Sequence, residues 1–260
     1  MVLNKKEKKI FQIILYRKNM KTSMPREKLE FFWGRGFEHL LKESKKFENS
    51  KIIKRKIKLV KRNIKQLLFL DWVKFIAITG SVAAGLGKKE DDVDVFIVVK
   101  NNRMWLYRAI LVLKLGIKSL RRVWGKPFKD KIDTNFICEE RGLYFDTKSI
   151  FILHELLFMI PVYNKDYYEK ILCINKKLLK CFEIEREESK VNKSKNYIFI
   201  FFNFIAFSIQ YIYMLVRNHK PNLRRLLKNN KKGRIAFFPE DFRKKKISEY
   251  KKFCQQIKQV

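Results

Sequence analysis

The sequence predicts an α/β (α+β) fold, in which a short mixed sheet is flanked by helices from both ends of the chain. Three apolar, β-branched runs have the length and composition of strands, at 72–79, 93–99 and 131–138. Apolar residues at helical spacing precede and follow these runs. A sheet with helices packed on its faces is the arrangement that buries the apolar sides of both kinds of element.

The order of these patterns divides the chain into three parts. Residues 1–70 form an N-terminal helical segment, 71–147 the core that carries the sheet, and 148–260 a C-terminal helical region. Within the first part, the stretch 51–69 places one apolar stripe on an otherwise basic helix. That stripe predicts a core-facing helix with a solvated Lys/Arg face, and a nucleic-acid-binding face is the alternative.

Helices are also expected after the strands. The segment 103–115 is in helical register and ends at Gly116. Further helices are predicted in the C-terminal region, at 148–160, 166–182, 196–216 and 244–257. The basic, Asn-containing run 224–234 is expected to be a mobile loop.

The stretch 197–216 allows two interpretations. It is twenty residues long, carries no charge and has Lys195 and Arg217 at its flanks, which meets the length rule for a membrane span. Asn203 and Gln210, however, are seven residues apart and share one helical face. A helix with one polar stripe also suits the centre of a soluble bundle, and we favour that interpretation.

The charge balance is strongly basic. Sixty Lys and Arg against 26 Asp and Glu give a formal net charge of +34, which attracts polyanions such as nucleotides, nucleic acids or anionic membranes. Heavy use of Lys, Ile, Asn and Phe throughout the chain offers a compositional explanation instead. The four cysteines show no zinc-binding spacing, and no secretory signal is evident. We therefore expect a cytoplasmic protein, with membrane association as the alternative.

The segment from Gly80 to Asp94 is the most informative part of the sequence. Asp92 and Asp94 open an apolar strand, and strand alternation places both carboxylates on the same side. Such a pair suits magnesium, which prefers oxygen ligands, and two metal ions can activate an attacking oxygen and stabilise a leaving pyrophosphate. Gly80 allows close approach of a phosphate to the backbone, and Ser81 can donate its hydroxyl.

This segment resembles the nucleotidyltransferase superfamily, the polymerase-beta-like group. It is most similar to bacterial proteins with an extended nucleotidyltransferase domain. The motifs that carry the resemblance are Gly80-Ser81-Val82-Ala83, Asp91-Asp92-Val93-Asp94, the run 102–108, Asn135-Phe136, Pro161 with Asn164, and Ala236-Phe237-Phe238-Pro239.

The resemblance implies a metal-dependent enzyme that transfers a nucleoside monophosphate from an NTP to an acceptor hydroxyl. Asp92 and Asp94 would bind Mg²⁺, and Gly80 and Ser81 the nucleotide. Arg108 could reach a phosphate or form a structural ion pair. Members of the superfamily modify RNA ends, antibiotics, proteins and small molecules, so the acceptor stays open. A catalytically silent nucleotide- or RNA-binding protein, or a membrane-associated one, are the alternatives.

The superfamily often supplies a third carboxylate from a later strand, and Asp133 is the candidate here, as a metal ligand or general base. Alternation predicts Asp133 and Asn135 on one face of that strand, with Ile132 and Phe136 on the other. The neighbouring pair His154-Glu155 is interpreted as lying on a helix surface rather than at a metal site.

Overall fold

The computed structural model describes residues 3–41, 50–120, 128–145, 148–216, 221–236 and 240–258. Five strands form one sheet in the order β4-β1-β2-β3-β5. They are β1 (Val73–Ile78), β2 (Val93–Val99), β3 (Ile132–Glu139), β4 (Ile160–Tyr163) and β5 (Arg234–Ala236). β2 and β3 are parallel and the other neighbouring pairs are antiparallel, which confirms the predicted mixed sheet.

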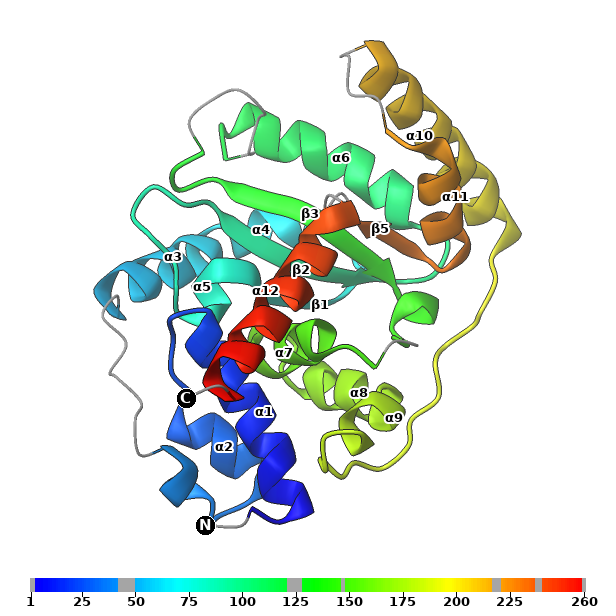
Figure 1. The fold of residues 1–260 in the computed structure, drawn as a ribbon. Coiled ribbons are helices and arrows are strands. Elements are labelled where there is room, and N and C mark those ends of the chain that lie inside the picture. The colour runs from blue at the N-terminus through cyan, green and yellow to red at the C-terminus, as the bar shows by residue number, and fades with distance from the viewer. Residues whose placement is uncertain are drawn as a thin grey trace.

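Helices surround this sheet (Figure 1). Those before or between the first three strands are α1 (Lys5–Asn19), α2 (Arg26–Trp33), the short η1 (Glu38–Leu41), α3 (Ser50–Arg62), α4 (Ile64–Leu67), α5 (Gly80–Ala84) and α6 (Met104–Ile117). Those after β3 are η2 (Glu140–Gly142), α7 (Ile150–Phe158), α8 (Asp166–Ile174), α9 (Lys176–Lys180), α10 (Tyr197–Val216), α11 (Leu223–Lys231) and α12 (Glu240–Lys258).

Both edge strands come from the C-terminal region, where the sequence analysis predicted helices and a loop but no strand. β4 pairs with β1, and β5 pairs with β3. The predicted helix 148–160 therefore ends at Phe158, and its last residue, Ile160, begins β4. The sheet thus joins residues from the predicted core and from the C-terminal region into one unit.

The two faces of the sheet support separate apolar clusters. Phe75 and Phe96 pack with α1, α2, α7 and α8 on one face, which we call the lower face after its position in Figure 1. Ile76 and Ile97 pack with α3, α4, α6 and α10 on the other, upper face. Strand alternation produces this division, because successive side chains point to opposite sides.

One irregularity in β3 changes which side chains share a face. Asp94 lies opposite Asp133, but Phe96 lies opposite Phe136, so β3 has one extra residue between these pairs. Ile132 consequently belongs to the upper cluster, whereas Phe136 stacks on Phe96 against the lower one. The predicted placement of Ile132 and Phe136 on one face was wrong, because a bulge breaks the two-residue period. The side chain of Asn135 lies outside the part of the chain that the structure describes.

The run 224–234 is not the predicted loop. Most of it forms α11, which Asn222 caps by accepting a hydrogen bond from the Arg225 N–H. Leu226 is buried in the upper cluster, and this anchorage explains why a basic, Asn-containing stretch is helical here. Of the Ala236–Pro239 motif, residues 237–239 lie outside the described residues.

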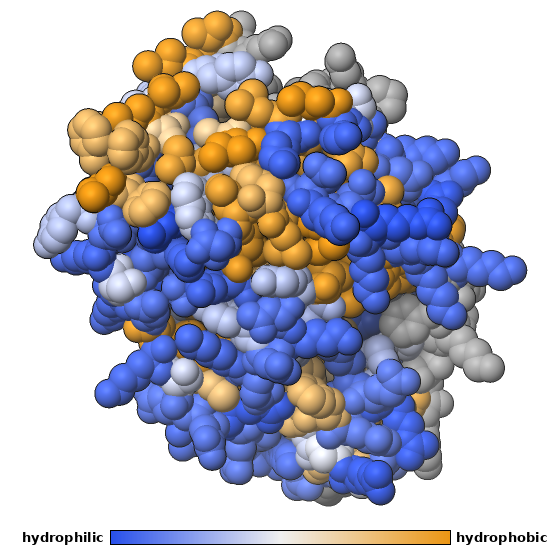
Figure 2. Space-filling model, turned by 180° about the vertical axis from the view of Figure 1, so that it is seen from behind, coloured by the Kyte–Doolittle hydropathy of each residue, from blue (hydrophilic) through white to orange (hydrophobic). Residues whose placement is uncertain are grey.

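α10 buries only one of its faces. The polar stripe predicted from Asn203 and Gln210 is confirmed, and both side chains are buried. The remaining circumference is apolar and largely exposed, and apolar side chains gather over α10 in the view from behind (Figure 2). Among the described residues, α10 is the one helix long and apolar enough to cross a membrane, with a mean hydropathy of 1.9 over its most apolar window.

Candidate active site

Three carboxylates converge where β2 and β3 begin. Asp92 directly precedes β2, Asp94 is the second residue of β2, and Asp133 is the second residue of β3. The parallel register places Asp94 opposite Asp133. One oxygen from each of the three carboxylates lies within 4.8 Å of the others. The chemistry of this donor set fits a hard divalent cation, which binds oxygen ligands.

The packing of β2 fixes the direction of these carboxylates. Val93, Val95 and Ile97 are at most 1% exposed and belong to the upper cluster. A strand that buries these residues must direct Asp94 to the same side as Phe96. The bulge in β3 then matters for the site, because it allows both Asp133 and Phe136 to lie on that lower face.

Gly80 is required by its contact with Asp94. Its φ is +65°, and a Cβ built on it would lie 2.2 Å from the Asp94 Oδ2 atom. Any other residue would collide with a candidate metal ligand and would also adopt a rarely populated backbone conformation. A backbone hydrogen bond also joins the two segments, since the N–H of the preceding residue, Thr79, donates to the Asp94 carbonyl at 3.0 Å.

Gly80 and Ser81 present hydrogen-bond donors beside the carboxylates. The Gly80 N–H donates to Glu155 Oε2 and the Ser81 hydroxyl to Asp91 Oδ2, both over a long 3.4 Å. Asp91 Oδ2 also accepts from the Lys88 N–H at 2.8 Å. The structure therefore brings the predicted residues Gly80, Ser81, Asp92, Asp94 and Asp133 to one place.

Two residues near the site have contacts that the sequence analysis did not predict. Glu155, predicted to lie on a helix surface with His154, is half-buried: one carboxylate oxygen lies 3.7 Å from His154 Nδ1, and the other accepts from the Gly80 N–H at the start of α5. Lys56 is fully buried, and its ammonium donates to the Asp91 and Lys89 carbonyls and lies 3.5 Å from an Asp130 carboxylate oxygen. Lys56 thus fixes the loop that leads into β2. Its position on the apolar stripe of residues 51–69 was the available signal.

His154 is likewise buried rather than on the surface, as part of a network with Arg17. The Arg17 guanidinium donates to the Ala84 carbonyl at 3.0 Å and lies 3.0 Å from His154 Nε2. It also donates to the Ser23 carbonyl at 2.6 Å. Burial lowers the pKa of His154, so the neutral ring is favoured and its Nε2 can accept the guanidinium proton. This network attaches α1 and α7 to the end of α5.

Arg108 lies elsewhere. Its guanidinium donates to Gln210 Oε1 at 2.5 Å, which links α6 to α10. Because α6 packs on the upper face, Arg108 is separated by the sheet from the carboxylates on the lower face. The contact with Gln210 therefore gives Arg108 a structural role between two helices.

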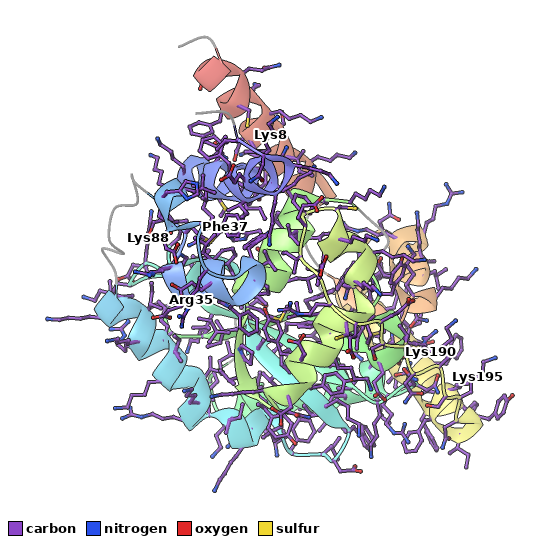
Figure 3. All side chains as sticks on the ribbon, turned by 90° about the horizontal axis from the view of Figure 1, so that it is seen from below. Lys8, Arg35, Phe37, Lys88, Lys190 and Lys195 are labelled. Carbon is purple, nitrogen blue, oxygen red and sulfur yellow. The ribbon has the colours of Figure 1, made fainter. Side chains whose placement is uncertain are left out.

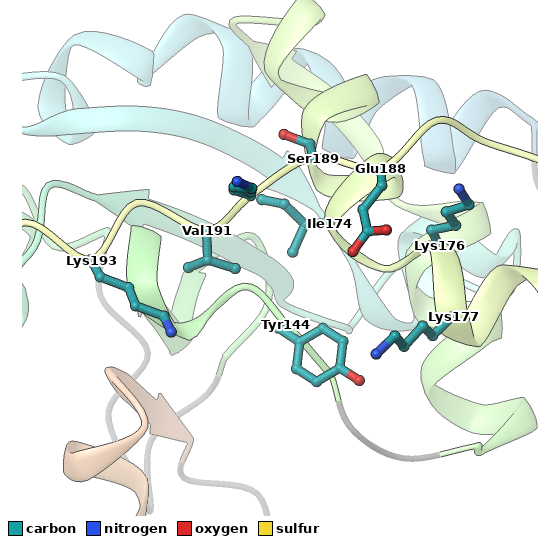
Figure 4. Close-up of a pocket in the computed structure, with 9 residues that line it drawn as sticks. Tyr144, Ile174, Lys176, Lys177, Glu188, Ser189, Val191 and Lys193 are labelled. Carbon is teal, nitrogen blue, oxygen red and sulfur yellow. The ribbon is translucent and has the colours of Figure 1, made fainter.

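Basic side chains surround the molecule. The labelled side chain of Lys88 lies at one side in Figure 3, and Lys190 and Lys195 lie at the other. A hollow of about 350 Å³ is lined partly by Lys176, Lys177 and Lys193 (Figure 4). It is near the opposite end of β2 from the carboxylates, because the Asn192 carbonyl beside it accepts from Asn101. We therefore assign it no part in the carboxylate site.

Comparison with known proteins shows which family the chain belongs to. A family model described as the nucleotidyltransferase domain matches residues 53–259, which include the whole sheet and all three carboxylates. Searches of curated proteins and of solved structures returned no match. The extent of the family match and the convergent carboxylates together establish that the chain belongs to the nucleotidyltransferase domain family, and that it is a transferase of phosphorus-containing groups.

Proposed function

We propose that this protein transfers a nucleoside monophosphate from an NTP to an acceptor hydroxyl and releases pyrophosphate. The observation that carries the proposal is the convergence of Asp92, Asp94 and Asp133, with carboxylate oxygens within 4.8 Å of one another. Three acidic groups in so small a volume repel one another unless cations or protons are bound, so the cluster favours a site for divalent cations.

Asp92 and Asp94 are the proposed ligands of Mg²⁺, in a site for two ions that Asp133 completes. The ions, when bound, would polarise the phosphate oxygens and lower the pKa of an attacking oxygen. Asp133 is only 5% exposed, and its carboxylate can hold the proton of the acceptor hydroxyl. Lys56 holds the Asp91 carbonyl, which keeps the backbone beside Asp92 in place.

Gly80 and Ser81 are the proposed phosphate-binding groups. Their present acceptors are carboxylate oxygens of Glu155 and Asp91, and both hydrogen bonds are long. Triphosphate oxygens can replace these acceptors without leaving the Gly80 N–H or the Ser81 hydroxyl unsatisfied. The absence of a side chain at Gly80 allows Asp94 to lie against it, which keeps the Gly80 N–H close to this proposed metal ligand.

The test is transfer of label from radioactive NTPs, with Mg²⁺, to pools of RNA, protein and small molecules. Asp94→Asn should lower transfer by at least about 10²-fold, because it removes a charge aimed at the reaction centre. Asp133→Asn should lower it by about 10²–10⁴-fold if that carboxylate accepts the proton. The pool that carries the label identifies the class of acceptor.

Asp166→Asn is the matched control, since Asp166 is exposed at the start of α8 and outside the site. It should transfer label like the wild type. Metal-dependent NTP binding without transfer to any pool would instead favour the silent binding protein. Transfer that is unchanged in a folded Asp94→Asn variant would contradict the assigned site.

A further inference from the structure

The outward face of α10 is an extended apolar surface. Its most exposed positions include Ile198, Phe201, Phe204, Ile209 and Ile212, with exposed fractions from 59% to 69%. Residues 201, 204, 205, 208, 209 and 212 follow helical spacing and therefore form one continuous face. Single exposed apolar side chains are ordinary, but a contiguous face of this size marks a contact with another apolar phase.

The polar side chains of α10 point the other way. Asn203 Oδ1 accepts hydrogen bonds from the N–H groups of Trp105 and Leu106, at 2.7 and 3.3 Å. Gln210 Nε2 donates to the Trp105 carbonyl at 2.8 Å. On the outward side, the Ser208 hydroxyl donates back to the Phe204 carbonyl of its own helix at 3.1 Å. Ser208 therefore does not depend on water, which suits an apolar environment.

These contacts restrict how α10 can meet a membrane. The bonds from Asn203 and Gln210 hold α10 along α6, and α6 carries Arg108 and Lys114. If α10 crossed the bilayer, α6 would be drawn into the hydrocarbon with both charges, at a cost of several kcal/mol. A helix that lies in the plane of the interface avoids this cost, because only its apolar face enters the lipid.

Charge decides between lipid and a second copy of the chain. The exposed residues Arg224 and Lys228 belong to α11, which lies beside α10 (Figure 1). Trp105 contacts both helices, with its ring against Phe207 and its indole N–H on Asn230. Two copies with a net charge of +34 each would repel one another at such a contact, whereas an anionic surface would attract both.

We propose that the outward face of α10 docks the protein on an anionic phospholipid bilayer, with α10 lying in the interface and α11 contributing basic contacts. Aromatic and aliphatic side chains would enter the boundary between headgroups and acyl chains, and Lys and Arg would remain among the headgroups. This surface is on the opposite side of the sheet from the carboxylates, so docking leaves the candidate active site free.

The test is flotation of the purified full-length chain with phosphatidylcholine vesicles, with and without phosphatidylglycerol. The wild type should float with the anionic vesicles, and binding should weaken as salt is raised. The triple variant Phe201→Gln/Phe204→Gln/Ile209→Gln should bind at least about 10-fold more weakly, because it replaces three lipid-facing side chains by polar ones. The double variant Phe11→Gln/Phe31→Gln, which changes exposed side chains of the N-terminal helices, should bind like the wild type.

Equal flotation of the wild type and a folded triple variant would overturn the proposal. So would a lipid-independent dimer, seen by sedimentation, that the triple variant converts to a monomer, since the face would then be covered by a second copy. Asp94→Asn should float like the wild type, and this result keeps the docking test independent of the proposed catalysis.

Discussion

α1 and α10 both pack on the outside of the same domain, but their outward faces have opposite character. α1 buries Ile10 and Ile13 and exposes Lys5, Lys8 and Lys18 to water. α10 buries Asn203 and Gln210 alongside apolar residues such as Phe207, and exposes phenylalanine and isoleucine side chains. The first arrangement is that of an amphipathic helix on a soluble protein, whereas the second has an apolar outward face.

In both helices, a buried polar side chain joins the helix to the backbone of neighbouring segments. Arg17 of α1 joins the carbonyls of Ser23 and Ala84, whereas Asn203 of α10 joins two backbone N–H groups of α6. The difference is confined to the outward faces. We infer that both helices are fixed to the domain by specific hydrogen bonds, and that only α10 is adapted to an apolar surrounding.

The largest expected effect on stability is that of Arg17→Met. The substitution leaves the Ser23 carbonyl and His154 Nε2 without their Arg17 donor, and each buried unsatisfied group costs about 1–3 kcal/mol. The Ala84 carbonyl loses one of two donors, since it keeps the hydrogen bond from the Thr22 hydroxyl. Relief of the buried charge offsets part of this, so we expect a loss of about 3 kcal/mol and a fall in Tm of roughly 6–12 °C. Differential scanning calorimetry measures both.

Arg26→Met is the matched control, because Arg26 is exposed and its ion pairs with Glu30 and Glu38 lie on the surface. Its Tm should equal that of the wild type. A Tm for Arg17→Met as high as that of Arg26→Met would show that α1 is held by apolar contacts alone.

A smaller loss is expected for Asn203→Ala. The residue before α6, Arg103, makes no side-chain cap hydrogen bond in the described structure, so Asn203 caps α6 from another helix. Removing a cap costs about 1–2 kcal/mol, which urea unfolding resolves. Ser208→Ala, also on α10, should change stability less, because its bond is to its own helix. Equal losses would contradict the capping role.

The sequence analysis could propose Gly80, Ser81, Asp92 and Asp94 as site residues because the pattern that joins them is local. Strand alternation around Asp92 and Asp94, and a glycine before a short helix, are patterns that neighbouring residues fix by themselves. The three strands 72–79, 93–99 and 131–138 were recognisable for the same reason. The expected metal and nucleotide chemistry stays a prediction that the proposed transfer assay tests.

What could not be predicted depends on contacts between distant residues. Arg108 meets Gln210, and Lys56 meets Asp91, only after the chain has folded. The bulge in β3 leaves no clear pattern in the sequence, although it determines that Phe136 shares a face with Asp133. The two short edge strands were missed because three or four residues carry too little periodicity to identify.

The smallest effect on folding is expected for substitutions on the outward faces of α10 and α1, which also test the contrast between these two helices most directly. In lipid-free buffer, Phe201→Gln/Phe204→Gln/Ile209→Gln should change the unfolding free energy by no more than about 1 kcal/mol, since these side chains are 62% exposed and glutamine favours helix slightly more. Lys5→Gln/Lys8→Gln/Lys18→Gln on α1 should also leave the unfolding free energy nearly unchanged.

Solubility in ammonium sulfate separates the α10 variant from the α1 variant, because that salt strengthens association of exposed apolar surface. The α10 variant should remain soluble at a higher salt concentration than the wild type, and the α1 variant should gain no solubility. If the α10 variant instead unfolds as readily as Arg17→Met, its outward face stabilises the domain itself, and α10 is an ordinary packing helix like α1.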